Sequence, residues 1–257
     1  MKPALAYNEP WLPKGWRDLP NGHLIAQAIE EHLEPCWPRI FGYHLLKLGA
    51  LSGKICSINS LISHQVVVTK SSESADVIAE IDDLPFLQQC VDACMLNHCL
   101  EFSVDPHHVL READRVLIPN GYMIISGYNP FSLAGLNQLI PFRRQQVPWQ
   151  GRFFTPMRVK DWLHLLGYEI VIDTRFLHAG LHSEINPDTW WFKSWQNFAG
   201  KFLSPMGSIY LIVAKKRVLP LTPIRPKWKM RPNFSPIKVS TKNTSSVIKS
   251  LSKPAQS

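Results

Sequence analysis

Apolar residues recur every three or four positions in three segments of the chain, which is the spacing of one face of an α-helix. The first segment begins at Asn21, and Pro35 ends it. The second follows Asp105, which can cap a helix, and Pro106, which suits the first helical position. The pattern therefore predicts helices at about residues 21–33, 106–117 and 156–166.

Short apolar runs between these segments have the length of buried β-strands. Gln65–Thr69 contains three consecutive valines, which is typical of a strand that is covered on both faces. The runs predict strands at about residues 43–48, 65–69, 75–81, 91–97, 122–126, 168–173 and 208–215. Strands that alternate with helices in this way predict a three-layer α/β domain with a mainly parallel sheet.

The two ends of the chain depart from this pattern. Residues 1–20 are rich in proline and contain Trp11 and Trp16, so we expect an irregular aromatic arm that lies on the domain. After Arg217, prolines alternate with lysine, arginine, serine and threonine without a sustained apolar period. The expected organisation is an N-terminal arm at 1–20, a folded domain at 21–222 and a basic, proline-rich, disordered tail at 223–257.

The net charge of +8 is unevenly divided along the chain. Residues 1–188 contain 15 basic and all 20 acidic side chains, whereas residues 189–257 contain 13 basic side chains and no acidic one. The positive excess therefore bears on what the C-terminal segment touches. Nucleic acid or an anionic surface could bind the tail, and a merely solubilising role is the alternative.

The remaining composition predicts a cytoplasmic protein without a metal site. No apolar run approaches the roughly 20 residues of a membrane-spanning helix, and the N-terminus has no signal-peptide core. The five cysteines do not form paired Cys-x2-Cys units, and their odd number argues against a disulfide framework. We expect free thiols.

One stretch of the chain has a more specific pattern. Asp76–Phe86 ends in an acid-x-x-x-Leu-Pro-Phe segment, and Val91–Cys94 and Leu100–Pro106 follow it. Leu110–Gly121 reads Leu-x-Glu-x-x-Arg-Val-Leu-x-Pro-x-Gly. These segments resemble the type 11 methyltransferase domain of the class I S-adenosylmethionine-dependent methyltransferases, and the resemblance extends over about residues 20–222, similar to an uncharacterised bacterial subgroup. It implies a Rossmann-like, seven-stranded, mainly parallel sheet with an antiparallel last strand.

The resemblance also implies where S-adenosylmethionine would bind. The loop with Gly49, Ala50, Leu51 and Gly53 corresponds to the glycine motif near the methionine portion of the cofactor. Glu80 corresponds to the acid that faces the adenine amino group, and Ile81 beside it is expected among the cofactor-binding residues. Leu96, Asn97 and His98 correspond to the stretch that lines the methyl-transfer channel, where His98 could orient or deprotonate the acceptor. A histidine that only caps the strand end is the alternative.

Three positions differ from the family pattern. Lys47 stands where the family has an acid, Leu51 replaces the middle glycine, and Thr69 stands where an acid usually closes the second strand. The leading hypothesis is methyl transfer to a small-molecule acceptor. A non-catalytic binding or regulatory protein with a degenerate cofactor loop is one alternative, and a nucleic-acid methyltransferase that uses the basic tail is another.

An aromatic segment with Trp190, Trp191, Phe192, Trp195 and Phe198 precedes the last expected strand. Its spacing is that of an amphipathic helix packed on the domain. A lid over the mouth of the active site is the alternative.

Overall fold

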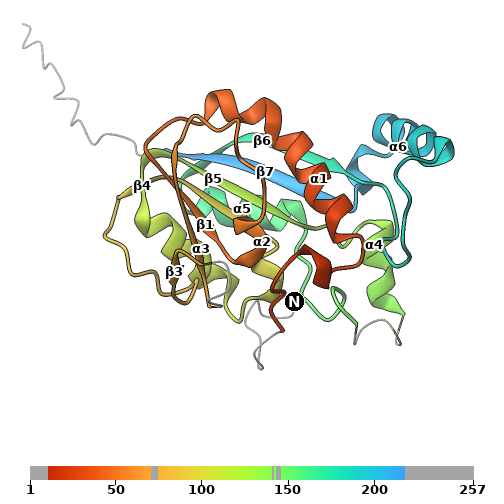
Figure 1. The fold of residues 1–257 in the computed structure, drawn as a ribbon, viewed down its shortest axis with the longest axis horizontal. Helices are drawn as coiled ribbons and strands as arrows, with labels where there is room; N and C mark the ends of the chain where they lie inside the picture. Colours follow the sequence, from red (N-terminus) through yellow and green to blue (C-terminus); the bar gives the residue numbers. More distant parts are fainter. Residues whose placement is uncertain (1–10, 71–74, 141, 143–145, 218–257) are drawn as a thin grey trace, which may run out of the picture. The chain divides into compact units, whose positions relative to one another are not determined.

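Within the residues that the computed structural model describes (11–70, 75–140, 142 and 146–217), seven strands form one sheet in the order β3-β2-β1-β4-β5-β7-β6 (Figure 1). Only β7 runs antiparallel to its neighbours, β5 and β6. The fold implied by the family resemblance is confirmed. The strands are β1 His44–Leu48, β2 His64–Thr69, β3 Val77–Ile78, β4 Val91–Asn97, β5 Leu117–Tyr128, β6 Tyr168–Phe176 and β7 Ile209–Lys216.

Three strands differ clearly in length from the prediction, and one of them, the sixth, extends to Phe176, beyond the expected end at 173. The third strand is short, because the carboxylate of Asp76 accepts the Val67 N–H at 2.8 Å in the place of a backbone partner. The fifth strand is longer than expected and includes the predicted turn at 119–121. There the register with β4 shifts, so the intervening residues bulge out of the ladder.

Helices cover both faces of the sheet. The described helices are α1 Gly22–Leu33, α2 Ala50–Gly53, α3 Pro106–Val116, α4 Leu133–Leu136, α5 Pro156–Leu165 and α6 Trp190–Phe202. As predicted, the Asp105 side chain caps α3 by accepting the N–H groups of His107 and His108, and the Thr155 side chain caps α5.

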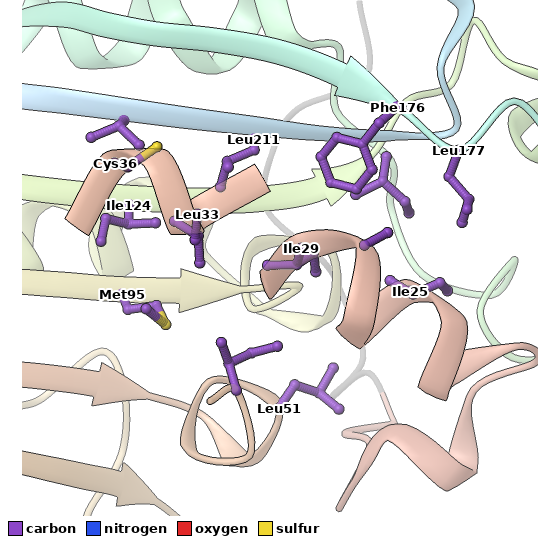
Figure 2. Close-up of a cluster of buried hydrophobic side chains, with 14 of the residues drawn as sticks. Ile25, Ile29, Leu33, Cys36, Leu51, Met95, Ile124, Phe176, Leu177 and Leu211 are labelled. Carbon is purple, nitrogen blue, oxygen red and sulfur yellow. The ribbon is translucent and has the colours of Figure 1, made fainter. Parts of the chain in front are cut away.

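Successive residues of the central strands enter two different hydrophobic cores, because side chains alternate across a sheet. In β4, Met95 belongs to the core beneath α1, whereas Leu96 belongs to the core beneath α3 and α5. Figure 2 shows Ile25, Ile29 and Leu33 of α1 against the sheet. This burial on both faces explains the continuous apolar strands of the sequence.

All described residues belong to one compact unit, Met1–Leu219. The predicted tail at 223–257 and the first ten residues of the predicted arm lie outside the described part of the chain. Among the residues that the structure describes, none of the helices has both the length and the apolar character needed to cross a membrane.

Candidate functional site

A cavity of about 350 Å³ lies at the carboxyl ends of β1 and β4, in the middle of the sheet. Ligands of doubly wound sheets bind at this edge, where neighbouring strand connections leave toward opposite faces. The volume is in the range of small-molecule sites. Six residues expected from the sequence line the cavity: Gly49, Ala50, Leu51, Ile81, Asn97 and His98.

Gly49 leaves β1 in a backbone conformation that is essentially restricted to glycine, with φ 82° and ψ 155°. Its N–H donates to the Val68 carbonyl oxygen at 2.8 Å. A β-carbon at this position would lie 2.8 Å from the sulfur of Cys99. The turn and the close approach of Cys99 therefore both require glycine, and they leave bare backbone in the cavity wall.

Two of the expected cofactor residues lie behind this wall. Gly53 faces β2, where an added β-carbon would lie 2.6 Å from Cγ1 of Val67, so glycine lets α2 pack closely on the sheet. Leu96 is fully buried in the core beneath α3 and α5. Both residues position the loops that form the cavity.

Leu51, which replaces the middle glycine of the family motif, is 2% exposed and packs in the core beneath α1 (Figure 2). Its carbonyl oxygen accepts the indole N–H of Trp16 at 3.1 Å. The side chain is therefore accommodated by the core, and the N-terminal arm is tied to the same loop.

Glu80 lines a smaller hollow of about 50 Å³ that shares Lys70 and Ile81 with the main cavity. Its carboxylate forms an ion pair with Lys70 at 2.6 Å, and both side chains are about half exposed. Because solvent screens such a pair, it adds little to stability. The arrangement places a carboxylate beside the apolar side chain of Ile81 at one end of the site.

Asn97 is fully buried at the end of β4 and is held by two serines. Its N–H donates to the Ser52 hydroxyl at 2.8 Å, and its Oδ1 accepts the Ser126 hydroxyl at 2.7 Å. Its amide Nδ2 has no hydrogen-bond partner among the described residues. A buried donor without a partner costs free energy, so this Nδ2 is suited to bond a ligand in the cavity.

His98 follows Asn97 in a left-handed backbone conformation, φ 51°, and is 1% exposed. Its Nδ1 lies 3.2 Å from Oε1 of Glu101, which also accepts the Tyr128 N–H at 2.7 Å. A carboxylate can only accept hydrogen bonds, so in the tautomer that satisfies this contact the ring proton is on Nδ1. The other ring nitrogen, Nε2, is buried without a partner in the described part of the chain.

Two tyrosine hydroxyls are buried near this pair. The rings of Tyr128 and His98 are 4.4 Å apart between centroids. Burial, and secondarily the charge of Glu101, raises the pKa of Tyr128 and of Tyr210 well above the usual value, so both hydroxyls keep their protons. A β-carbon at Gly127 would overlap the Tyr210 hydroxyl and lie 2.6 Å from Oε1 of Glu101. Glycine thus permits this cluster.

The N-terminal arm covers the same cavity. Leu12, Pro13 and Lys14 contribute to its lining. Trp16 packs edge-on against the His98 ring, with 5.7 Å between the centroids. His98, the loop that follows β1 and the N-terminal arm therefore meet at one place.

All five cysteines carry free thiols in the structure. Among the described residues, no group of three or more side chains is arranged to hold a metal ion. Cys99 lines the cavity, but burial raises its pKa to about 12, and its thiol donates to the Leu48 carbonyl oxygen at 2.9 Å. A protonated thiol is a poor nucleophile, so this cysteine is a wall residue.

Lys47, which replaces the family's acid, is 5% exposed and donates from Nζ to the Ile55 carbonyl oxygen at 2.9 Å. Burial lowers its pKa, and the charges of Cys56, Glu30 and Asp76 oppose the shift. Its ammonium group is thus engaged at the end of α2, behind the cavity wall.

We expect Lys47→Met to change the affinity for S-adenosylmethionine by no more than about twofold, because the ammonium group does not face the ligand. The wild type should gain stability as the pH rises from the lowered pKa toward 10.5, since the unfolded chain then binds more protons than the folded one. Lys47→Met should lack this gain. Calorimetric titration and urea unfolding at neutral and alkaline pH measure both effects, and a large loss of affinity would contradict the placement of Lys47.

Sequence reasoning missed Glu101, Tyr128 and Tyr210 as parts of the site. Glu101 could have been found, because it is a charged residue between two apolar ones, Leu100 and Phe102. The tyrosines gave no such signal, since aromatic residues in buried strands are ordinary.

Residues 46–125, which span β1 to β5, match a family model described as a methyltransferase domain. The sheet order and the cavity at the ends of β1 and β4 agree with this match. Together they define the class as the S-adenosylmethionine-dependent methyltransferases of class I, whose cofactor is S-adenosylmethionine. Within that class the chain belongs to one family with the uncharacterised protein YafS of Escherichia coli (strain K12), with 41% identity over 226 residues, 86% of this chain and 88% of that protein.

Solved structures share the fold at low sequence identity. A methyltransferase from Haloferax volcanii, in complex with the activator Trm112, is 14% identical with a TM-score of 0.53 over 76% of this chain and 94% of that one. An S-adenosylmethionine-dependent methyltransferase from Archaeoglobus fulgidus is 20% identical with a TM-score of 0.51 over 74% and 94%. The likeness extends to the arrangement of the sheet and its helices.

Proposed function

We propose that this protein transfers a methyl group from S-adenosylmethionine to a small-molecule acceptor that releases a proton, and that His98 takes up this proton. The observation that carries the proposal is the buried Nε2 of His98, which has no partner among the described residues and whose other ring nitrogen is held by Glu101. A base in this arrangement suits an acceptor hydroxyl or an acidic C–H group.

The residues around the cavity fit the cofactor. Bare backbone at Gly49 allows close approach of the amino-acid portion, and Nδ2 of Asn97, which has no partner in the described part of the chain, can donate to an oxygen of the ligand. Glu80 offers an acceptor at the end where the adenine amino group is expected. When bound, S-adenosylmethionine supplies a methyl carbon activated by the sulfonium, so the protein needs only to align the reactants and remove one proton.

Each residue of the buried pair has a separate task. His98 accepts the acceptor's proton at Nε2. Glu101 acts as a positioning residue, because it holds the ring orientation through Nδ1 and stabilises the imidazolium that results. Tyr128 fixes Glu101 through its backbone N–H, so the carboxylate does not need to move.

The size of the acceptor that can react is limited by how accessible His98, the proposed general base, is from outside the protein. His98 is 1% exposed, and Trp16 of the arm packs on its ring. A small molecule can enter a cavity of about 350 Å³. A nucleobase of a folded nucleic acid would first have to be flipped out of its stack. Access therefore favours a small acceptor over the nucleic-acid alternative.

Calorimetric titration with S-adenosylmethionine and S-adenosylhomocysteine tests the proposal, and saturable binding of both is expected. Glu80→Ala should weaken binding by about three- to tenfold, the value of one hydrogen bond to the ligand. Asp161→Ala, which removes an exposed carboxylate from α5, is the matched control and should leave the affinity unchanged.

The same titration separates the alternatives. Absence of binding at millimolar ligand would favour the non-catalytic binding protein with a degenerate loop. Cofactor binding together with salt-sensitive binding of RNA or DNA by the full-length protein would favour the nucleic-acid methyltransferase. An unchanged affinity of Glu80→Ala would show that the adenine end is misplaced.

A further inference from the structure

Helix α6 exposes a row of aromatic side chains. Trp191, Trp195, Phe198 and Phe202 follow one another at helical intervals of four, three and four residues, so they lie on one face. Their exposed fractions are 58%, 38%, 53% and 64%, and Trp190 in the first turn is 81% exposed. We call the four residues of this face the aromatic stripe. A contiguous row of exposed apolar side chains is typical of an interaction site.

An adjacent face of α6, about 100° around the helix axis from the stripe, is fixed to the domain. Phe192 and Ala199 are buried. Gln196 accepts the His178 N–H at 2.9 Å, and the indole of Trp195 donates to the His178 carbonyl oxygen at 2.8 Å. These contacts set the rotation of the helix about its axis, so the aromatic stripe is held at the surface.

The charge of α6 and of the sequence that follows it favours an anionic partner, and Lys201 flanks the stripe, whereas Lys193 lies on the far side of the helix. Helix α6 carries Lys193 and Lys201 and has no acidic residue, although Lys193 pairs with Asp188 at 3.1 Å just before the helix. Lys201 lies 5.7 Å from the ring centroid of Phe202. The chain from 189 to 257 contains 13 basic residues and none that is acidic. Tryptophan and phenylalanine next to lysine are typical of helices that lie in the headgroup layer of a membrane.

The stripe shares one edge of the sheet with the cavity. Because β5 and β6 both run antiparallel to β7, their carboxyl ends lie at the same edge as those of β1 and β4. Helix α6 follows β6, and α4 follows β5 with exposed apolar residues at Phe131, Leu133, Leu136 and Phe142. Figure 1 shows α4 and α6 at the same end of the domain.

We propose that α6 docks the protein on an anionic lipid surface, with the aromatic stripe in the headgroup layer and the basic residues against the phosphates. The helix has 13 residues, fewer than the roughly 20 of a spanning helix, so it lies along the surface. The inference does not depend on methyl transfer, because binding to lipid is measured without cofactor.

The test is flotation of the full-length protein with vesicles of phosphatidylcholine alone and of phosphatidylcholine mixed with phosphatidylglycerol. The wild type should bind the anionic vesicles and release them as salt is raised. A triple variant, Trp191→Ser, Phe198→Ser and Phe202→Ser, should lose binding by about tenfold or more, since it removes most of the inserted apolar area. Trp195 is left unchanged because its indole anchors the helix.

A matched triple variant controls for general loss of surface apolarity. Tyr43→Ser, Ile58→Ser and Leu87→Ser remove side chains that are 80%, 86% and 82% exposed and that lie outside α6. This variant should bind vesicles like the wild type, and both variants should unfold at the temperature of the wild type. The folded state is thereby checked separately from lipid binding.

Three results would overturn the proposal. The first is a wild type that does not bind anionic vesicles at low salt. The second is a stripe variant that binds them like the wild type, which would assign the binding to other basic residues of the chain. The third is a wild type that is a dimer in light scattering and becomes a monomer in the stripe variant, which would make the stripe an interface between two copies.

Discussion

His98→Asn is expected to lower the rate of methyl transfer by about 10²- to 10⁴-fold, the contribution of a general base. Asparagine can still donate or accept a hydrogen bond near the position of Nδ1, but it cannot take up a proton. The affinity for S-adenosylmethionine should change far less, because the base acts on the acceptor. The measurements are transfer of a labelled methyl group into the small-molecule fraction of a cell extract and calorimetric titration of the cofactor.

A second buried histidine supplies the control. His178 is 4% exposed, and its Nε2 lies 3.0 Å from the Leu203 carbonyl oxygen, away from the cavity. His178→Asn should leave the transfer rate unchanged in the folded protein. Glu101→Gln keeps the shape of the positioning residue and should lower the rate less than His98→Asn, without loss of cofactor affinity. If His98→Asn, His178→Asn and Glu101→Gln all lost the same share of the transfer rate, in step with a loss of thermal stability, the role of His98 would be structural.

Gly49→Ala should destabilise the protein by about 1–3 kcal/mol, since alanine is strained at φ 82° and ψ 155°. The new β-carbon would also lie 2.8 Å from the Cys99 sulfur, so the loop must shift at the cavity wall. We expect the affinity for S-adenosylmethionine to fall by at least about tenfold. A loss of about 1.4 kcal/mol of binding free energy is enough for that factor, and the displaced loop forms part of the cavity wall. Urea unfolding and calorimetric titration measure the two effects.

Gly200→Ala is the matched control for the same chemical change. Gly200 lies within α6, and nothing lies within 4 Å of an added β-carbon there. Alanine should stabilise the helix by about 0.5–1 kcal/mol and leave cofactor binding intact. If Gly49→Ala behaved like Gly200→Ala, the tight turn would have no role in binding.

The charge distribution gains a more definite meaning from the structure. The basic excess of the C-terminal segment begins at α6, whose aromatic residues are exposed on one face. The sequence suggested either packing or a lid for this segment. The structure shows a helix that packs on the domain through Phe192 and Ala199 and leaves most of its aromatic side chains exposed to solvent. Amphipathic spacing alone cannot tell which face is covered, because aromatic residues suit both.

Most secondary structure was predictable because it depends on local periodicity and capping. The helix at 106–116 follows from Asp105, Pro106 and one apolar face, and its cap forms as expected. The strand at 117–128 was predicted too short, because Pro119 and Gly121 indicate a turn. Pairing with β4 overrides that local preference by bulging residues 118–121 out of the ladder.

By itself, the sequence determined the α/β class, the two-sided core and the family, since these depend on the order of apolar runs and on contiguous motifs. Only the tertiary structure decided what the candidate side chains contact. Lys47 bonds Ile55 at the end of α2, Leu51 enters the core, and Glu101 holds His98. Lys47 and Ile55 are only eight residues apart, and His98 and Glu101 only three. Whether such side chains meet depends on the turns that follow β1 and β4 and on the packing around them, and residue spacing alone does not encode those directions.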